Sequence, residues 1–241
     1  MKSLVEALKP LVPSALKQPL KRWMGANSWL SPDWHRQAVG GQWDELGQLQ
    51  FDFLLRQGLL PKHFFLDVGC GSLRGGVHFI RYLEAGHYYG IDKSQQLLDA
   101  GRNVELRNAG LIERVPTLLQ TDTFEFGALH RQFDFAIAQS VFTHIALNDI
   151  VRCMMNMEKA LNPGGRFYVT FFENPKGKQH LEPLTHPRTE GPGVVSFFDK
   201  DPFHYDFGTF QWICQGTRLR VEYIGEWNHP RGQRMMCFVR M

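Results

Sequence analysis

Short apolar runs alternate with amphipathic segments along most of the chain. A run such as 64–68, in which nearly every residue is apolar, is typical of a strand buried on both faces of a parallel sheet. Apolar residues spaced three and four apart, as in 44–57, are typical of a helix with one buried face. The pattern predicts strands over 64–68, 88–92, 115–121, 133–139, 166–172, 219–227 and 234–240. It predicts helices over 44–57, 73–83, 94–108, 148–160 and 206–215.

Two polar residues are expected to cap helices. Ser94 precedes one predicted helix, and Asn148 begins another. Side-chain oxygens of Ser and Asn accept hydrogen bonds from the free N–H groups of a first helical turn. Each residue is therefore predicted to lie at a helix N-terminus.

A glycine-rich turn connects the first predicted strand to the helix that follows it. Asp67 lies near the end of the strand, and Gly69 and Gly71 come directly after it. Because glycine has no Cβ, the backbone can turn sharply there and approach a ligand closely. A strand, a glycine turn and a helix N-terminus form a nucleotide-type cleft at the carboxyl end of a sheet. The dinucleotide fingerprint G-x-G-x-x-G is not met, because its third position is Arg74.

An acidic residue ends the second predicted strand. Asp92 lies 21 residues after Gly71, where an acid at the end of a second strand accepts hydrogen bonds from ribose hydroxyls. The alternative is a local helix cap, which is a common role for a lone Asp at the end of a strand. The spacing favours the ribose role.

Two segments carry a resemblance to a known family. Residues 67–76 resemble motif I of the class I S-adenosylmethionine-dependent methyltransferases, an acid followed by x-G-x-G-x-G, with Leu73 at the third glycine. The Leu-x-Pro-Gly-Gly turn at 161–165 is also common in that family. The resemblance covers 44–241. It implies an α/β fold, a Rossmann-like three-layer sandwich with a mostly parallel seven-stranded sheet whose last strand is antiparallel.

The resemblance also implies S-adenosyl-L-methionine as the cofactor. The motif I residues would hold its methionine end, an acid after the third strand would bind adenine, and the end of the fourth strand would hold the amino acid moiety. Arg74 is expected near the methionine carboxylate, with capping of the turn as the alternative. The residues expected to bind the cofactor are Asp67, Gly69, Cys70, Gly71, Arg74, Asp92, Asp122 and Gln139.

Two histidines are candidates for catalysis. A hydroxyl acceptor is helped by a general base, and His is the usual choice near neutral pH. His144, just past the fourth predicted strand, is the first candidate, and His229, between the last two strands, is the second. A structural role for His144, with a hydrogen bond to a backbone carbonyl, is an equal alternative. No group of His, Asp and Glu has metal-ligand spacing, so no metal is expected.

Composition narrows the class of protein. A chain of 241 residues that is 43% hydrophobic can bury the core of one α/β domain. Its net charge of +3, without a block of like charges, favours a small-molecule acceptor over nucleic acid. Four cysteines lie far apart, as expected of reduced thiols in the cytoplasm. No run of 18 apolar residues is present, so no membrane span is expected.

Two segments lie outside the predicted sheet. Residues 1–43 are predicted to form a basic amphipathic arm and cap, of which 1–22 either contacts membranes peripherally or packs as a structural arm. Residues 173–212 are predicted to be an insertion that covers the acceptor. The sequence thus predicts a cytoplasmic methyltransferase domain over 44–241, acting on a sugar, a lipid-linked intermediate or a secondary metabolite. The alternatives are a nicotinamide-dependent oxidoreductase and a catalytically silent binding protein with the same fold.

Overall fold

The computed structural model describes residue 31 and residues 33–175, 181–189 and 191–241. The chain divides into two units, Met1–Gly41 and Gln42–Met241. The described part of the first unit contains helix α3 (Trp34–Ala38). The predicted membrane contact of residues 1–22 lies outside the described residues.

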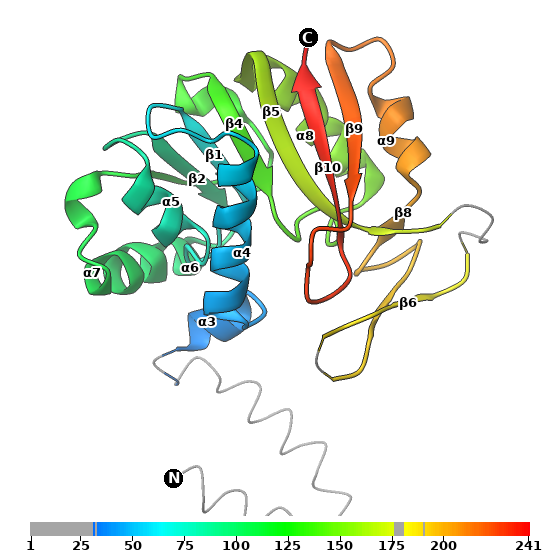
Figure 1. Ribbon diagram of the computed structural model, residues 1–241, viewed down its shortest axis with the longest axis horizontal. Helices are drawn as coiled ribbons and strands as arrows, with labels where there is room; N and C mark the ends of the chain where they lie inside the picture. Colours follow the sequence, from blue (N-terminus) through cyan, green and yellow to red (C-terminus); the bar gives the residue numbers. More distant parts are fainter. Residues whose placement is uncertain (1–30, 32, 176–180, 190) are drawn as a thin grey trace, which may run out of the picture. The chain divides into compact units, whose positions relative to one another are not determined.

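The second unit is organised around one mixed sheet (Figure 1). Its strands within the described residues are, in spatial order, β3 (Thr117–Gln120), β2 (Tyr88–Asp92), β1 (Phe65–Val68), β4 (Phe133–Ala138), β5 (Leu161–Glu173), β10 (Arg234–Arg240) and β9 (Leu219–Gly225). The first five pair in parallel, whereas β10 is antiparallel to both β5 and β9. The predicted Rossmann-like sheet with an antiparallel last strand is confirmed. One strand was not expected, because β8 (His204–Tyr205) also pairs with the end of β5.

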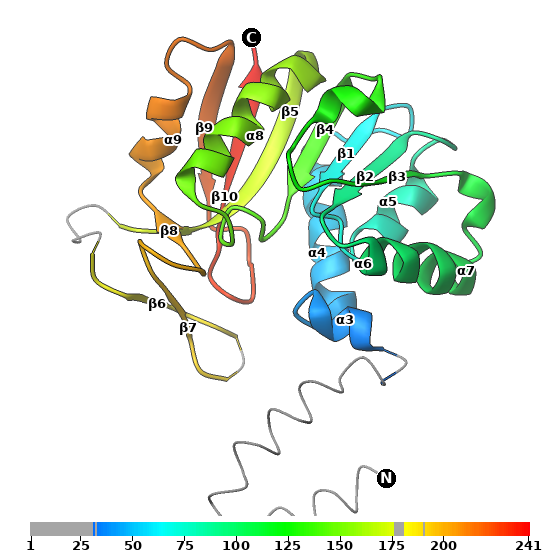
Figure 2. The same ribbon diagram turned by 180° about the vertical axis from the view of Figure 1, so that it is seen from behind.

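Helices cover both faces of the sheet (Figures 1 and 2). One face carries α4 (Trp43–Arg56), α5 (Gly76–Tyr82), α6 (Gln95–Ala100), the π-helix η3 (Gly101–Glu105) and α7 (Leu106–Asn108). The other face carries α8 (Leu147–Ala160) and α9 (Phe207–Ile213). Short 3-10 helices, η4 (Ile112–Arg114) and η5 (Phe126–Leu129), lie in the connections. Within the part of the chain that the structure describes, no helix is long and apolar enough to span a bilayer.

Each central strand sends alternate side chains to two separate apolar cores. Along β4, Phe135 and Ile137 belong to the core that also holds side chains of α4 and α5. Ala136 and Ala138 belong to the core that holds side chains of α8 and α9. Because successive side chains point to opposite faces and both faces are covered, the strand reads as an unbroken apolar run.

Some of the helix ends were predicted correctly. Ser94 caps α6 as expected, since its Oγ accepts a hydrogen bond from the N–H of Leu97 at 3.3 Å. The prediction for Asn148 is wrong, because α8 begins at Leu147 with Ala146 as the N-cap residue. The helix expected from Leu73 begins only at Gly76. The backbone of Leu73 explains this delay, because its φ of +72° is left-handed and cannot start a right-handed helix.

Leu73 occupies a conformation that usually belongs to glycine. A left-handed φ costs an L-residue about 1–2 kcal/mol. The Leu73 side chain is fully buried, and burial of a leucine contributes about 1.5–3 kcal/mol, which offsets that cost. Two glycines make the room: a Cβ at Gly76 would lie 2.8 Å from Leu73 Cδ2, and a Cβ at Gly101 would lie 2.9 Å from Leu73 Cγ. The turn therefore accommodates a leucine at the position where motif I has its third glycine.

We expect Gly101→Ala to lower the free energy of unfolding by about 1–2 kcal/mol. Overpacking of a core costs about 1–3 kcal/mol, whereas the higher helix propensity of Ala returns at most about 1 kcal/mol. Urea denaturation checks the change, with Gly127→Ala as the matched control, because a Cβ there meets nothing within 4 Å. A Gly101→Ala protein as stable as the control would show that Leu73 is not tightly packed.

Candidate functional site

The carboxyl ends of β1, β2 and β4 meet at one edge of the sheet, the lower edge in Figure 1. Asp67, near the end of β1, is in register with Gly90 of β2 and with Ile137 of β4. Because the three strands are parallel, the segments that follow them leave from the same edge. The motif I turn, Asp92 and Gln139 are thereby brought together, as the sequence predicted.

Asp92 holds the glycine turn through its side chain. Its Oδ2 accepts a hydrogen bond from the N–H of Gly71 at 2.8 Å, and its Oδ1 accepts one from the N–H of Ser94 at 2.8 Å. Each carboxylate oxygen has a further lone pair, so the side chain can still accept bonds from a ligand. The structure thus shows local hydrogen bonds of Asp92, and its ribose role stays a prediction.

The first glycine of the turn permits a close approach to the loop after β4. Gly69 has a φ of +73°, and a Cβ there would lie 2.5 Å from Cγ2 of Val141. Any side chain at this position would push the two loops apart. The next residue, Cys70, is buried and donates its N–H to the carbonyl of Ile91 at 3.0 Å.

Asp67 is almost completely buried beside this turn. Its Oδ2 accepts a hydrogen bond from the hydroxyl of Tyr88 at 2.8 Å. Burial raises the pKa of Asp67 to about 7, and Asp92 adds to the rise, while Tyr88 and Arg74 oppose it. A Cβ at Gly76 would lie 2.6 Å from the Tyr88 hydroxyl, so the missing side chain leaves room for this bond. Tyr88 was not identified from the sequence, because it occupies an ordinary strand position.

Arg74 contacts the end of β4. One of its guanidinium nitrogens donates to Oε1 of Gln139 at 2.6 Å, and both side chains are buried. Burial lowers the pKa of Arg74 to about 10, and the charge of Arg231 lowers it further, while Asp67 opposes the change. Even so, the guanidinium keeps its proton at neutral pH and places a positive charge at the site.

A chain of polar contacts continues from Gln139 to the β9–β10 loop. Gln139 Nε2 donates to the Ser140 hydroxyl at 2.7 Å and lies 3.0 Å from Nε2 of His229. The hydroxyls of Ser140 and Thr170 both donate to Oε1 of Gln233, at 3.0 and 2.7 Å. The network therefore joins the carboxyl ends of β4 and β5 to the β9–β10 loop.

His229 lies inside this network. Its Nδ1 accepts the N–H of Arg231 at 3.2 Å, and its ring stacks on Trp227 with 5.3 Å between the ring centroids. Burial lowers the pKa of His229 to about 3, with contributions from the charges of Arg231 and Arg74. A ring with so low a pKa holds an accepted proton weakly, and the role of His229 as a base stays a prediction.

His144 lies on the segment that leaves β4. Its N–H donates to the carbonyl of Val141 at 2.9 Å, so it is one turn beyond the residue that touches Gly69. Among the described residues, the ring has no hydrogen bond to a backbone carbonyl, which was the structural alternative. Its side chain is 54% exposed, and Nδ1 lies 2.5 Å from Oδ1 of Asp201. Asp201 was not identified from the sequence, because the two residues are 57 positions apart.

Asp122 lies just past β3 and is exposed. The N–H of its neighbour Thr121 donates to the carbonyl of Asp92 at 3.0 Å. Asp122 therefore follows Asp92 along the same edge of the sheet.

The insertion lies beside the same edge. It contains the hairpin of β6 (Leu184–His186) and β7 (Val194–Ser196), and then β8. The N–H of Thr189 donates to the carbonyl of Pro230 at 2.8 Å, and the N–H of Phe203 donates to the carbonyl of Thr143 at 2.7 Å. The insertion is thus anchored to both loops that carry candidate catalytic histidines.

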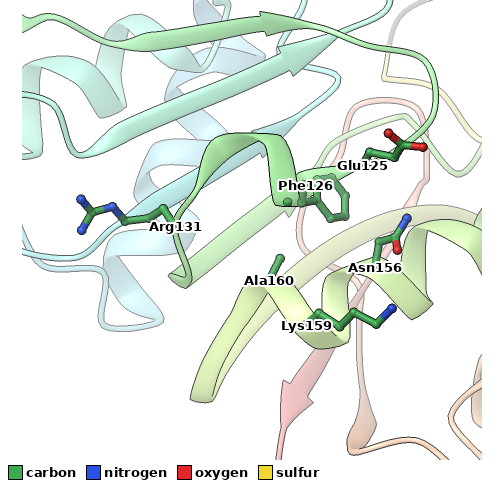
Figure 3. Close-up of a pocket in the computed structure, with 7 residues that line it drawn as sticks. Glu125, Phe126, Arg131, Asn156, Lys159 and Ala160 are labelled. Atoms are coloured by element: carbon green, nitrogen blue, oxygen red, sulfur yellow. The ribbon is translucent and has the colours of Figure 1, made fainter.

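A shallow surface pocket of about 280 Å³ lies elsewhere, near the amino ends of β4 and β5 (Figure 3). Its lining residues are Glu125, Phe126, Gly127, Arg131, Asn156, Lys159 and Ala160. None of the residues predicted to bind the cofactor lines it. Within the described ranges, no group of three or more His, Cys, Asp and Glu side chains could hold a metal ion.

Comparisons with known proteins agree with this geometry. Residues 66–167 match a family model described as a methyltransferase domain. An uncharacterized methyltransferase of Schizosaccharomyces pombe is 28% identical over 106 residues, which are 42% of this chain and 36% of the relative. The match thus spans about a third of that relative's length.

Two solved structures share the fold. Magnesium protoporphyrin IX methyltransferase from Synechocystis PCC 6803 with bound S-adenosylmethionine has a TM-score of 0.58 at 15% identity, covering 81% of each chain. The glycopeptide N-methyltransferase MtfA complexed with S-adenosylhomocysteine has a TM-score of 0.57 at 16% identity, covering 82% of this chain and 90% of that one. The methyltransferase-domain match runs from β1 into β5 of a sheet with this strand order, and it supports the predicted resemblance to the class I S-adenosylmethionine-dependent methyltransferases.

Proposed function

We propose that this protein transfers the methyl group of S-adenosylmethionine to a small-molecule acceptor. The proposal rests on one observation: a hydrogen bond connects the loop after β1 to the end of β2. There the Gly71 N–H bonds Asp92, and buried Asp67 lies beside them. This arrangement offers a fixed glycine turn and two carboxylates at one edge of the sheet.

The residues present fit the chemical groups of this cofactor. Asp67 is placed to receive the ammonium group of its methionine end, and Asp92 has lone pairs for the ribose hydroxyls. Arg74 supplies a positive charge for the methionine carboxylate. Gly69 leaves open a space that a Cβ would fill, next to Val141. Asp122 would accept a hydrogen bond from the adenine amino group, because it follows β3.

The protein's own contribution is binding, orientation and the exclusion of water. The cofactor, when bound, supplies a sulfonium-activated methyl group. The hydrogen bonds of Ser140 with Gln139 and Gln233 connect the segment after β4 to the β9–β10 loop. These two segments would hold the acceptor in a fixed orientation next to the methyl group. The insertion, anchored at Thr143 and Pro230, closes the acceptor side.

Two observations support a small-molecule acceptor. Two of the structural neighbours are named for a porphyrin and a glycopeptide. The chain has a net charge of only +3, whereas nucleic-acid binding relies on many phosphate contacts from clustered Lys and Arg.

The test is transfer of labelled methyl groups from S-adenosylmethionine into a fractionated metabolite extract, with total RNA and protein in parallel. Label in a small-molecule fraction supports the proposal, and label only in RNA or protein contradicts the acceptor class. Cofactor binding without transfer to any fraction would identify a silent binding protein. Isothermal titration calorimetry with S-adenosylhomocysteine separates that outcome from a failure to bind.

We expect Asp92→Ala to weaken S-adenosylhomocysteine binding by about 30- to 1000-fold. Hydrogen bonds from two ribose hydroxyls to a carboxylate contribute about 2–4 kcal/mol together after solvent replaces part of the loss. Calorimetry measures the affinity, and Glu113→Ala is the control because it removes an exposed acid far from the turn. A folded Asp92→Ala protein with unchanged affinity would refute the ribose assignment.

Cofactor affinity should fall at acidic pH because of Asp67. The pKa of this carboxyl in the cofactor-free protein is raised by burial to about 7, so below that pH it is protonated and cannot pair with an ammonium group. The dissociation constant for S-adenosylhomocysteine should rise by up to about tenfold per pH unit below neutrality. Asp67→Asn should bind weakly at every pH and remove this dependence. A pH-independent affinity for the native protein would contradict the assignment.

Asp67 should also make the stability of the cofactor-free protein depend on pH. Stability should fall as pH rises, whereas cofactor affinity should rise. Because the folded protein holds the Asp67 proton more tightly than the unfolded chain does, this carboxyl's contribution to the free energy of unfolding falls as pH rises from about 4 to about 7. Above that range Asp67→Asn, which cannot ionise, should melt at a higher temperature than the cofactor-free native protein. Thermal denaturation across this pH range provides the check.

A further inference from the structure

His144 and Asp201 meet beside the loop that follows β4, although they come from different segments. Nδ1 of His144 lies 2.5 Å from Oδ1 of Asp201, and the two side chains are 54% and 58% exposed. Ion pairs as exposed as this one contribute little to the stability of a fold. The pair is therefore of more interest for its chemistry than for its effect on folding.

The backbone holds both partners in place. On the His144 side, the N–H of His144 bonds the carbonyl of Val141, and Ser140 donates its N–H to the hydroxyl of Thr170 at 2.7 Å. On the Asp201 side, the N–H of Phe197 donates to the carbonyl of Pro202 at 2.7 Å and closes a short loop.

One hydrogen bond connects the two segments directly beside the pair. The N–H of Phe203 donates to the carbonyl of Thr143 at 2.7 Å. The carboxylate therefore reaches the imidazole from a segment fixed to the loop after β4.

We propose that Asp201 positions His144 and that the pair acts as a general base on a hydroxyl group of the acceptor. The inference rests on the proposed methyl transfer and extends it to a substrate class and to one further residue. A carboxylate at Nδ1 keeps the ring hydrogen on that nitrogen, so the lone pair of the neutral ring is on Nε2. The same division of roles operates in Ser-His-Asp sites, where the carboxylate orients the ring and stabilises its protonated form.

The transfer step is balanced with these groups. The acceptor oxygen forms a bond to the methyl carbon, the bond between that carbon and the sulfonium sulfur breaks, and its electron pair stays on sulfur. The hydroxyl proton moves to Nε2 of His144, and the carboxylate of Asp201 compensates the positive charge of the ring. The proton then passes from the exposed ring to solvent.

A base of this kind matches a hydroxyl better than an amine. A neutral amine attacks with a free lone pair and loses its proton after the bond forms. A hydroxyl is a weak nucleophile until its proton is removed, and a positioned base contributes about 10²–10⁴-fold to such a step. The insertion, which supplies Asp201, would thus complete the catalytic group in addition to covering the acceptor.

The first test determines which nitrogen of the His144 ring carries the hydrogen, and it needs no acceptor. Long-range ¹H–¹⁵N NMR, at a pH where the ring is neutral, should show the hydrogen on Nδ1 in the native protein. The signal is assigned by its loss in His144→Gln. Asp201→Ala should shift the tautomer toward a hydrogen on Nε2, while Asp199→Asn should leave it unchanged, because Asp199 is an exposed acid in the same loop. A native ring with its hydrogen on Nε2, or an Asp201→Ala spectrum like the native one, would overturn the proposal.

The second test follows methyl transfer into the metabolite extract, with products separated into O-methyl and N-methyl compounds by mass spectrometry. Asp201→Asn should lower the initial rate of O-methyl formation by about 10- to 100-fold, and His144→Gln by at least as much. Both variants should bind S-adenosylhomocysteine as the native protein does. Native-like rates in either variant, or N-methyl products alone, would overturn the base assignment. If the native protein does not bind S-adenosylhomocysteine, the proposed function is refuted, whereas the NMR result on the His144 ring still stands.

Discussion

The hydrogen bond from the Gly71 N–H to the Asp92 carboxylate is the contact on which the candidate site depends. It ties the turn after β1 to the end of β2, and the second oxygen of the same carboxylate holds Ser94, which caps α6. One side chain therefore sets the distance between the glycine turn and the start of a helix. The register of β1 and β2 brings these groups together, so the site is a product of the parallel sheet.

Hydrogen bonds between buried polar groups connect this turn to the other half of the sheet. Such groups are stable only when they are hydrogen-bonded, and Gln233 satisfies Ser140 and Thr170 at once. Arg74 is held by Gln139, in the network that also contains His229. The β9–β10 loop is consequently fixed by the ends of β4 and β5, and the insertion is fixed in turn by that loop. A change at either end of this network alters the walls of the site.

The sequence was sufficient for the sheet, the glycine turn and the position of Asp92 at the end of β2, because apolar runs, missing side chains and strand-end spacing are local signals. It was insufficient for Tyr88 and Asp201, whose roles arise from contacts with Asp67 and His144 across long separations. Leu73 shows a related limit. Its left-handed backbone is tolerated because Gly76 and Gly101 leave space for its side chain, and no reading of the turn alone reveals that Gly101 faces it.

The position of β10 has a consequence for how the chain assembles. This strand follows β9 in sequence but lies between β5 and β9, so β9 has no partner in the sheet until β10 is present. During synthesis the edge of β5 remains unpaired while roughly the last third of the described domain emerges, and an open strand edge invites wrong pairing. Gln233, at the entry to β10, reaches Ser140 and Thr170 only in this final step. The nascent chain therefore has a nearly complete parallel sheet before its polar network can form, and the β9–β10 hairpin closes both together.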